Sequence, residues 1–156
     1  MLNYCKGKWA ENEEKLEEII RNSTDHNSWN YRDLLKLVVE NILNRGHRGY
    51  GVEDNKEWDS ADITEIDNGD YQGTKIFVFH RKCYQPSEVE YLFTYVDYGS
   101  CSCCDTLQGI QAEGDLNSRL PSKSQVKDYM TLCRDMVVRM KQPFKNPYFY
   151  LEESKV

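Results

Sequence analysis

Two stretches of this chain, residues 74–80 and 89–98, carry apolar side chains at neighbouring positions rather than only at alternate ones. The first contains four consecutive apolar residues, Ile76–Phe79. A strand that is apolar on both faces is typical of a central position in a sheet with cover on both sides. The chain therefore has to build a buried sheet, and other elements have to cover it.

A shorter strand is expected around Ile63 and Ile66, just before the sequence Asp67–Asp70. This sequence contains an Asn-Gly pair, which readily adopts the positive φ angles of a tight hairpin turn. The three expected strands follow one another closely along the chain. They predict a three-stranded antiparallel meander.

Helical periodicity flanks these strands on both sides. Asn30, followed three residues later by Asp33, predicts a capped helix start. Cys133 falls on an apolar stripe with spacings of three and four residues, which places it in the core. The expected helices cover residues 10–21, 31–44, 105–112 and 124–140.

The resulting order, α-α-β-β-β-α-α, predicts a single α+β domain over residues 1–156, in which helices cover the meander. Residues 143–156 are expected to form a C-terminal tail. We find no internal repeat and no domain boundary. A chain of 156 residues is long enough to bury a core without disulfide or metal staples.

The charge of the chain excludes some classes of partner. Its formal net charge is −6, and an acidic chain without a long basic stripe is not expected to bind nucleic acid. The apolar runs are too short to cross a bilayer, and the first residues lack a secretory apolar segment. We therefore expect a cytoplasmic protein. From Arg119 onward basic residues outnumber acidic ones, which is either a solvated helix face or a surface that steers an acidic partner.

The most informative stretch is residues 99–106, which read Gly-Ser-Cys-Ser-Cys-Cys-Asp-Thr. They lie between a predicted strand end and a predicted helix start, a junction that presents free backbone N–H groups to an anion or a thiolate. Cysteines in the cytoplasm are expected as thiols or ligands before disulfides. Three interpretations stay open: a capped turn with Ser102 or Asp105 as the cap, a binding site, and a reactive Cys103 or Cys104.

Zinc is a further alternative. Cys101 and Cys104 form one C-x-x-C pair, and His80 and Cys83 form an upstream H-x-x-C pair. Two such knuckles are typical of structural zinc sites. In an antiparallel hairpin, however, the two pairs belong to opposite ends of the strands, which argues against a shared ion. The other two histidines, His26 and His47, are expected in exposed loops.

The sequence lacks the usual enzymatic signatures, such as a phosphate-binding loop or a nucleophile elbow. Two segments resemble a family of small proteins encoded by tailed phages and prophages: Ile66–Thr74, which contains Tyr-Gln-Gly-Thr, and Tyr98–Gln108. The resemblance covers roughly residues 4–142. Cys101, Cys104 and Asp105 match the family's cysteine turn, and Cys103 takes its variable position. The resemblance implies a phage origin, no particular reaction, and action on host machinery, including defence systems.

Three functions follow as hypotheses. The first is a non-enzymatic accessory protein that binds a host protein or a small anionic ligand such as a nucleotide. The second is thiol redox chemistry, in which Cys104 attacks and Cys101 resolves, or zinc binding by the same pair. The third is a structural role in the virion or in replication. The binding residues expected for the first are Tyr71, Gln72, Tyr98, Gly99, Ser100, Ser102, Asp105 and Thr106.

Overall fold

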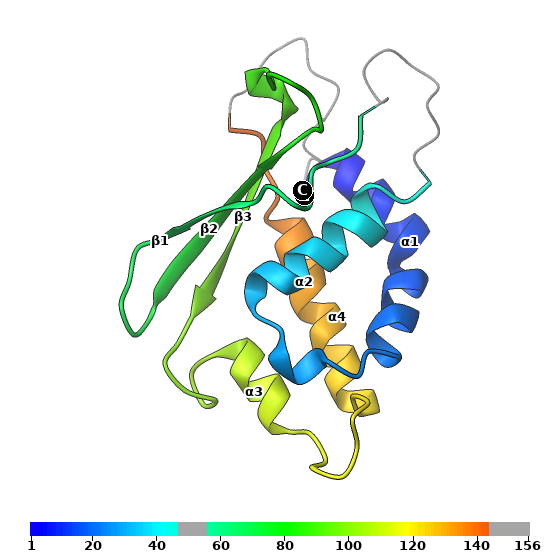
Figure 1. The fold of residues 1–156 in the computed structure, drawn as a ribbon, viewed down its shortest axis with the longest axis vertical. Helices are drawn as coiled ribbons and strands as arrows, with labels where there is room; N and C mark the ends of the chain where they lie inside the picture. The colour runs from blue at the N-terminus through cyan, green and yellow to red at the C-terminus, as the bar shows by residue number, and fades with distance from the viewer. Residues whose placement is uncertain (47–55, 144–156) are drawn as a thin grey trace.

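The computed structural model describes residues 1–46 and 56–143. Figure 1 shows one sheet with the long helices packed beside it. The expected order of helices and strands and the α+β class are confirmed. Parts of the expected loop, with His47, and the tail from residue 144 onward lie outside the described residues. The helices are α1 (Asn3–Arg21), α2 (Tyr31–Val38), α3 (Thr106–Ala112) and α4 (Lys123–Val138), and the strands are β1 (Thr64–Asp67), β2 (Gly73–His80) and β3 (Tyr91–Tyr98).

The sheet is the expected antiparallel meander in the order β1-β2-β3. The pairing of β2 with β3 places Gly73 opposite Tyr98 at one end and His80 opposite Tyr91 at the other. These two ends of the hairpin matter for the site, because the C-x-x-C pair follows the first and the H-x-x-C pair lies at the second.

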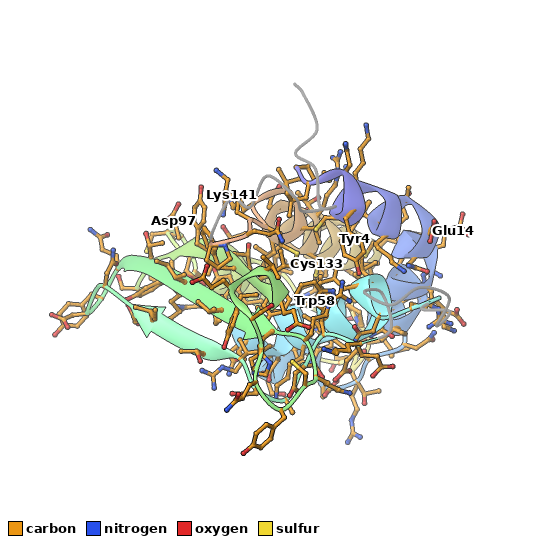
Figure 2. The ribbon with its side chains drawn as sticks, turned by 90° about the horizontal axis from the view of Figure 1, so that it is seen from above. Tyr4, Glu14, Trp58, Asp97, Cys133 and Lys141 are labelled. Atoms are coloured by element: carbon orange, nitrogen blue, oxygen red, sulfur yellow. The ribbon has the colours of Figure 1, made fainter. Side chains whose placement is uncertain are left out.

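Within the described residues the helices cover one face of the sheet, whereas the sequence predicted cover on both faces. Leu92, Thr94 and Val96 are buried under the helices, whereas Phe93 and Tyr95 on the opposite face are half-buried. Figures 1 and 2 show the helices on one side of the sheet. On this face Val78 lies opposite Phe93 and Ile76 lies opposite Tyr95. The guanidinium of Arg139 lies over the Tyr95 ring, 4.9 Å from its centroid, and covers part of it.

The turn between β1 and β2 also differs from expectation. Neither Asn68 nor Gly69 has a positive φ. Instead, the Asn68 carboxamide oxygen accepts a hydrogen bond from the backbone N–H of Thr74 at 2.8 Å, which closes a wider turn. Gly69 is required there by a close approach, because a Cβ would lie 2.0 Å from the carbonyl oxygen of Gln72.

Helix α1 begins seven residues earlier than the expected start at residue 10. Its buried stripe contains the polar Asn12, whose amide donates to the carbonyl of Ile42 at 3.0 Å. The first two turns were missed because no side chain caps the helix start at Leu2 and the first turn has no acidic residue, so no local signal marks that start. The capped start of α2 is confirmed, because Asn30 and Asp33 form reciprocal hydrogen bonds. A π-helical turn, Val39–Leu43, continues α2.

The core lies between the sheet and the helices, where Trp58 and Cys133 are fully buried (Figure 2). The core position expected for Cys133 is confirmed. His26, which was expected in an exposed loop, is 1% exposed, and its Nδ1 lies 2.9 Å from the hydroxyl of Tyr129. That hydroxyl gives the imidazole a buried partner that sequence could not indicate. None of the helices in residues 1–46 and 56–143 has the length and apolar character needed to span a membrane.

Candidate functional site

The cysteine turn connects the end of β3 with the start of α3, as the sequence predicted (Figure 1). The chain leaves the sheet at Tyr98 and enters the helix at Thr106. Cys101, Cys103 and Cys104 are all exposed between these points. The turn therefore presents three accessible thiols on a short segment whose two ends are fixed by regular structure.

Asp105 fixes the cysteine turn from its buried side. Its buried carboxylate caps α3 by accepting from the N–H of Gln108 at 2.8 Å, and it accepts from the N–H of Gly99 at 3.0 Å. The hydroxyl of Tyr31 donates to the same carboxylate at 3.1 Å and accepts from the N–H of Leu107 at 3.3 Å. Since these donors are already occupied, they are not open to a bound anion, and the carboxylate already interacts with the positive end of the short helix.

Backbone contacts close the turn tightly. The carbonyl oxygen of Cys101 accepts from the N–H groups of Cys104 and Asp105, at 3.0 and 2.8 Å. A Cβ at Gly99 would lie 2.5 Å from the carbonyl oxygen of Cys104 and 2.8 Å from its sulfur. A Cβ at Gly109 in α3 would lie 2.9 Å from the carbonyl oxygen of Ser102. The two glycines thus allow the turn to pack closely against β3 on one side and α3 on the other.

The closure of the turn brings Cys101 and Cys104 together. Their sulfur atoms lie 2.9 Å apart, whereas a disulfide bond measures about 2.05 Å. The Cys104 sulfur also lies 3.2 Å from the N–H of Cys101, which donates to it, and 3.8 Å from the hydroxyl of Ser100. The Cys104 sulfur also lies 3.4 Å from the carbonyl oxygen of Cys101, to which its thiol can donate, so within the turn it contacts one fixed donor, one acceptor and two groups that can do either.

These contacts polarise the pair. The hydrogen bond from the Cys101 thiol lowers the pKa of Cys104, with further support from the N–H of Cys101 and the hydroxyl of Ser100. The same thiol–thiol hydrogen bond raises the pKa of Cys101. The two sulfurs share a hydrogen bond, so they titrate as a pair, and the thiolate form is favoured at Cys104 relative to Cys101.

The remaining expected site residues separate into two groups. Ser102 and Thr106 are exposed beside the cysteines. Tyr98 is half-buried and its hydroxyl donates to Asp67 at 2.6 Å, which ties β3 to the end of β1. Tyr71 and Gln72 are exposed on the β1–β2 turn, and within the described residues no hydrogen bond or ring contact joins either of them to the cysteine turn. The structure therefore gathers the 98–106 segment and leaves Tyr71 and Gln72 apart from it.

The H-x-x-C pair lies at the other end of the hairpin, as the antiparallel topology implied. His80 Nε2 lies 3.0 Å from the carboxylate of Asp62, and the Cys83 sulfur lies 3.7 Å from that of Glu90. Among residues 1–46 and 56–143, no three His, Cys, Asp or Glu side chains are grouped so that they could hold a metal ion. The geometry thus gives no support to a zinc ion shared between the two pairs.

Two surface hollows flank the cysteine turn. One, of about 850 Å³, lies on the Cys101 side between the turn, α3 and the 24–27 segment, and its lining includes Arg119 and Asp115. The other, of about 360 Å³, lies between the turn, α3 and α4, and Cys103 and Cys104 contribute to its lining. A reactant can therefore approach the thiol pair from either flank.

Sequence reasoning missed Tyr31 and the part of α4 that borders the second hollow. Tyr31 contacts Asp105 from a helix that lies more than seventy positions earlier in the chain. No local sequence pattern predicts such a contact. Asp128, Thr131 and Asp135 line the second hollow and recur at helical spacing on α4. The helical spacing of these residues can be recognised in the sequence. Their position beside the cysteine turn cannot, because it depends on how α4 packs.

The chain was compared with family models, curated proteins and solved structures. No protein-family model, no curated protein and no solved structure matches this chain. The resemblance to phage-encoded proteins therefore stays a prediction, and the thiol pair on its anchored turn is the feature from which a function has to be argued.

Proposed function

We propose that Cys101 and Cys104 form a redox-active dithiol that undergoes exchange with disulfides. The observation that carries this proposal is the pair itself: two exposed sulfurs 2.9 Å apart, in a turn whose hydrogen bonds lower the pKa of Cys104 and raise that of Cys101. A lowered pKa increases the thiolate fraction at neutral pH, and the thiolate is the nucleophile in disulfide exchange.

The exchange proceeds in two balanced steps. The Cys104 thiolate attacks one sulfur of a disulfide, forms a mixed disulfide with it, and releases the other sulfur as a thiolate. Cys101 then loses its proton and attacks the Cys104 sulfur, which forms the Cys101–Cys104 disulfide and releases the second thiolate. The dithiol is oxidised by two electrons, and the disulfide substrate is reduced to two thiols.

The other described cysteines are poor candidates for this chemistry. Burial raises the pKa of both Cys5 and Cys133 to about 12. Partial desolvation and the charge of Glu90 raise the pKa of Cys83. Cys103 is exposed, but it is not part of the thiol–thiol hydrogen bond. The proposal therefore assigns attack to Cys104 and resolution to Cys101.

The test is oxidation of the reduced protein by neutral hydroxyethyl disulfide, followed by peptide mass spectrometry. We expect a Cys101–Cys104 disulfide to be the main product. Cys101→Ser is expected to accumulate the mixed disulfide on Cys104, and Cys104→Ser to react much more slowly. Cys83→Ser is the matched control, and it should react like the parent chain. Oxidation at equal rates in Cys104→Ser and the parent chain would overturn the proposal.

A second candidate, binding of an acidic protein partner, is favoured by a separate groove of about 630 Å³ between α1 and α4. Trp9, Val126 and Met130 provide its apolar floor. On the α1 side the lining contains Glu13 and the ion pair between Glu17 and Arg21. On the α4 side it contains Lys123, Lys127 and Arg134, and within the described chain none of these three cations forms an ion pair. Unpaired cations beside an apolar floor complement an acidic amphipathic segment. The groove between α1 and α4 supports the hypothesis that the chain binds a host protein.

The groove is tested with a synthetic acidic amphipathic helix as the probe, by isothermal titration. We expect binding that weakens at high salt and is lost in the Lys127→Glu, Arg134→Glu double variant. Lys6→Glu, which changes a cation on α1 outside the groove, is the matched control. Equal binding by the double variant and the control would remove this candidate and leave the thiol proposal untouched.

A further inference from the structure

The two flanks of the cysteine turn differ in charge. On the Cys101 side, the lining contains one Arg and one Asp, and its other side chains are uncharged. On the Cys104 side, the residues that line the hollow include four carboxylates and no Lys or Arg. The four are Asp105, Glu113, Asp128 and Asp135.

Three of these carboxylates are free to act on a reactant. Asp105 is buried and committed to the turn and the helix cap. Glu113 and Asp135 are exposed and Asp128 is half-buried, and among the described residues none of the three forms an ion pair. Asp128 and Asp135 lie two turns apart on the same face of α4, so both can face the hollow. Their charges are therefore uncompensated at the place where a reactant meets Cys104.

Uncompensated charge of one sign inside a concave surface acts on the approach of a charged reactant. A hollow with low-dielectric walls focuses the field, and it changes association rates by about one to three orders of magnitude in favourable cases. Exchange also places negative charge on the attacking, central and leaving sulfurs. A positive group on the substrate is attracted by the carboxylates and offsets this charge, whereas a negative group adds to the repulsion.

We propose that the Cys104 flank selects disulfides that carry positive charge, either small cationic disulfides or protein disulfides flanked by Lys or Arg, over anionic ones of the glutathione type. This inference rests on the proposed function, because it names the substrate class of the same thiol pair. It assigns to Glu113, Asp128 and Asp135 a role in substrate selection, with no part in the bond exchange itself.

The experiment measures formation of the mixed disulfide on Cys104 in a chain that carries Cys101→Ser and Cys103→Ser. The three probes are cystamine, which is cationic, hydroxyethyl disulfide, which is neutral, and dithiodipropionate, which is anionic. The rate with each charged probe is divided by the rate with the neutral probe. These ratios are then compared between variants, so that intrinsic differences among the probes cancel.

We expect the Asp128→Asn, Asp135→Asn double variant to lower the cystamine ratio and to raise the dithiodipropionate ratio, each by about fivefold at low salt. Glu113→Gln is expected to act in the same direction with a smaller effect. Asp115→Asn, which removes a carboxylate from the opposite flank, is the matched control and should leave both ratios unchanged. Raising the ionic strength from about 0.01 M to about 0.15 M should weaken the discrimination, because the Debye length falls from about 30 Å to about 8 Å.

The possible results distinguish a failure of charge selection from a failure of the dithiol proposal. Exchange on Cys104 with ratios that are the same in the double variant and the parent would overturn charge selection and leave the dithiol proposal intact. The same holds if Asp115→Asn changes the ratios as much as the double variant does. Failure of all three probes to react at Cys104, both in this chain and in the Cys103→Ser chain that retains Cys101, would overturn the dithiol proposal and the charge selection with it.

Discussion

At one end of the β2–β3 hairpin the Cys83 sulfur lies beside the carboxylate of Glu90, and at the other end the Cys104 sulfur lies beside the thiol of Cys101. Partial desolvation and the charge of Glu90 raise the pKa of Cys83, whereas the neighbouring thiol lowers that of Cys104. Both residues lie in turns next to the same pair of strands. The pKa values of the two thiols therefore shift in opposite directions, because desolvation and a carboxylate act on Cys83 and a neighbouring thiol acts on Cys104.

The histidines near the two ends show the same contrast. Burial lowers the pKa of His26, which is linked to α3 through Gln111. Burial also acts to lower the pKa of His80, but hydrogen bonds to the carbonyl of Arg81 and to Asp62 outweigh it and raise that pKa. The pKa of His80 is thus set by a carbonyl and a carboxylate that accept from it, and the pKa of His26 is set by burial. Variants that change one end and not the other test this division.

The largest effect is expected from Asp105→Ala. The substitution removes the cap of α3 and leaves the N–H of Gly99 and the hydroxyl of Tyr31 without their acceptor. A lost cap costs about 1 kcal/mol and each buried unpaired polar group about 1–3 kcal/mol, so we expect a loss of about 3 kcal/mol in the free energy of unfolding. Urea denaturation measures it.

The matched substitution at the other end is Glu90→Ala. Glu90 accepts from the N–H of Ser87 and pairs with Lys56, but it is partly exposed, so water can replace it. The expected loss is about 1 kcal/mol. If the two variants lose equal stability, Asp105 is not the anchor of the cysteine turn that its contacts indicate.

A smaller effect is expected from Gly99→Ala. The new methyl group would lie 2.5 Å from the carbonyl oxygen of Cys104, so the turn has to move away from β3. We expect a loss of about 2 kcal/mol, as for an overpacked site, together with slower reaction of Cys104. Gly7→Ala is the control, because a Cβ there has no heavy atom within 4 Å. In a helix that substitution should add about 0.5–1 kcal/mol of stability.

Urea denaturation measures the stability of Gly99→Ala, and mass spectrometry measures the reaction of its Cys104. Both are needed to test the role of Gly99. A variant that loses stability but retains the reactivity of Cys104 would show that the close packing serves the fold alone. A variant with parental stability would contradict the close approach itself. The expected result is a joint loss, because the same atoms that meet the methyl group hold the sulfur in place.

Local sequence patterns predicted most of the fold, but they predicted less of the candidate site. The strands, the α2 cap and the helical stripe that contains Cys133 depend on neighbours a few residues apart, and the sequence predicted all of them. The strand-to-helix junction at Tyr98 and Thr106 was also predicted. Tyr31, the burial of His26 and the acidic flank on α4 depend on contacts between distant segments. Such contacts have no local signal, so the turn was found and its surroundings were not.

The smallest effect concerns the two histidines and the pH dependence of stability. The pKa of His26 is lowered in the folded chain, so its contribution is fully present above pH of about 6.5 and is lost as the pH falls through the folded-state pKa. The pKa of His80 is raised, so its contribution is fully present below pH of about 6.5 and is lost as the pH rises through its folded-state pKa. Acidification therefore weakens one end and strengthens the other.

Urea denaturation of the parent chain, His26→Gln and His80→Gln at several pH values separates the two contributions. The comparison uses the change in stability with pH, so a constant loss from either substitution does not affect it. We expect His26→Gln to lose less stability than the parent on acidification and His80→Gln to lose more, with the smaller difference for His80, since Asp62 is largely exposed and its pairing with His80 is screened. Parallel curves for all three chains would contradict the division, because the two histidines would then titrate alike in the folded and unfolded states.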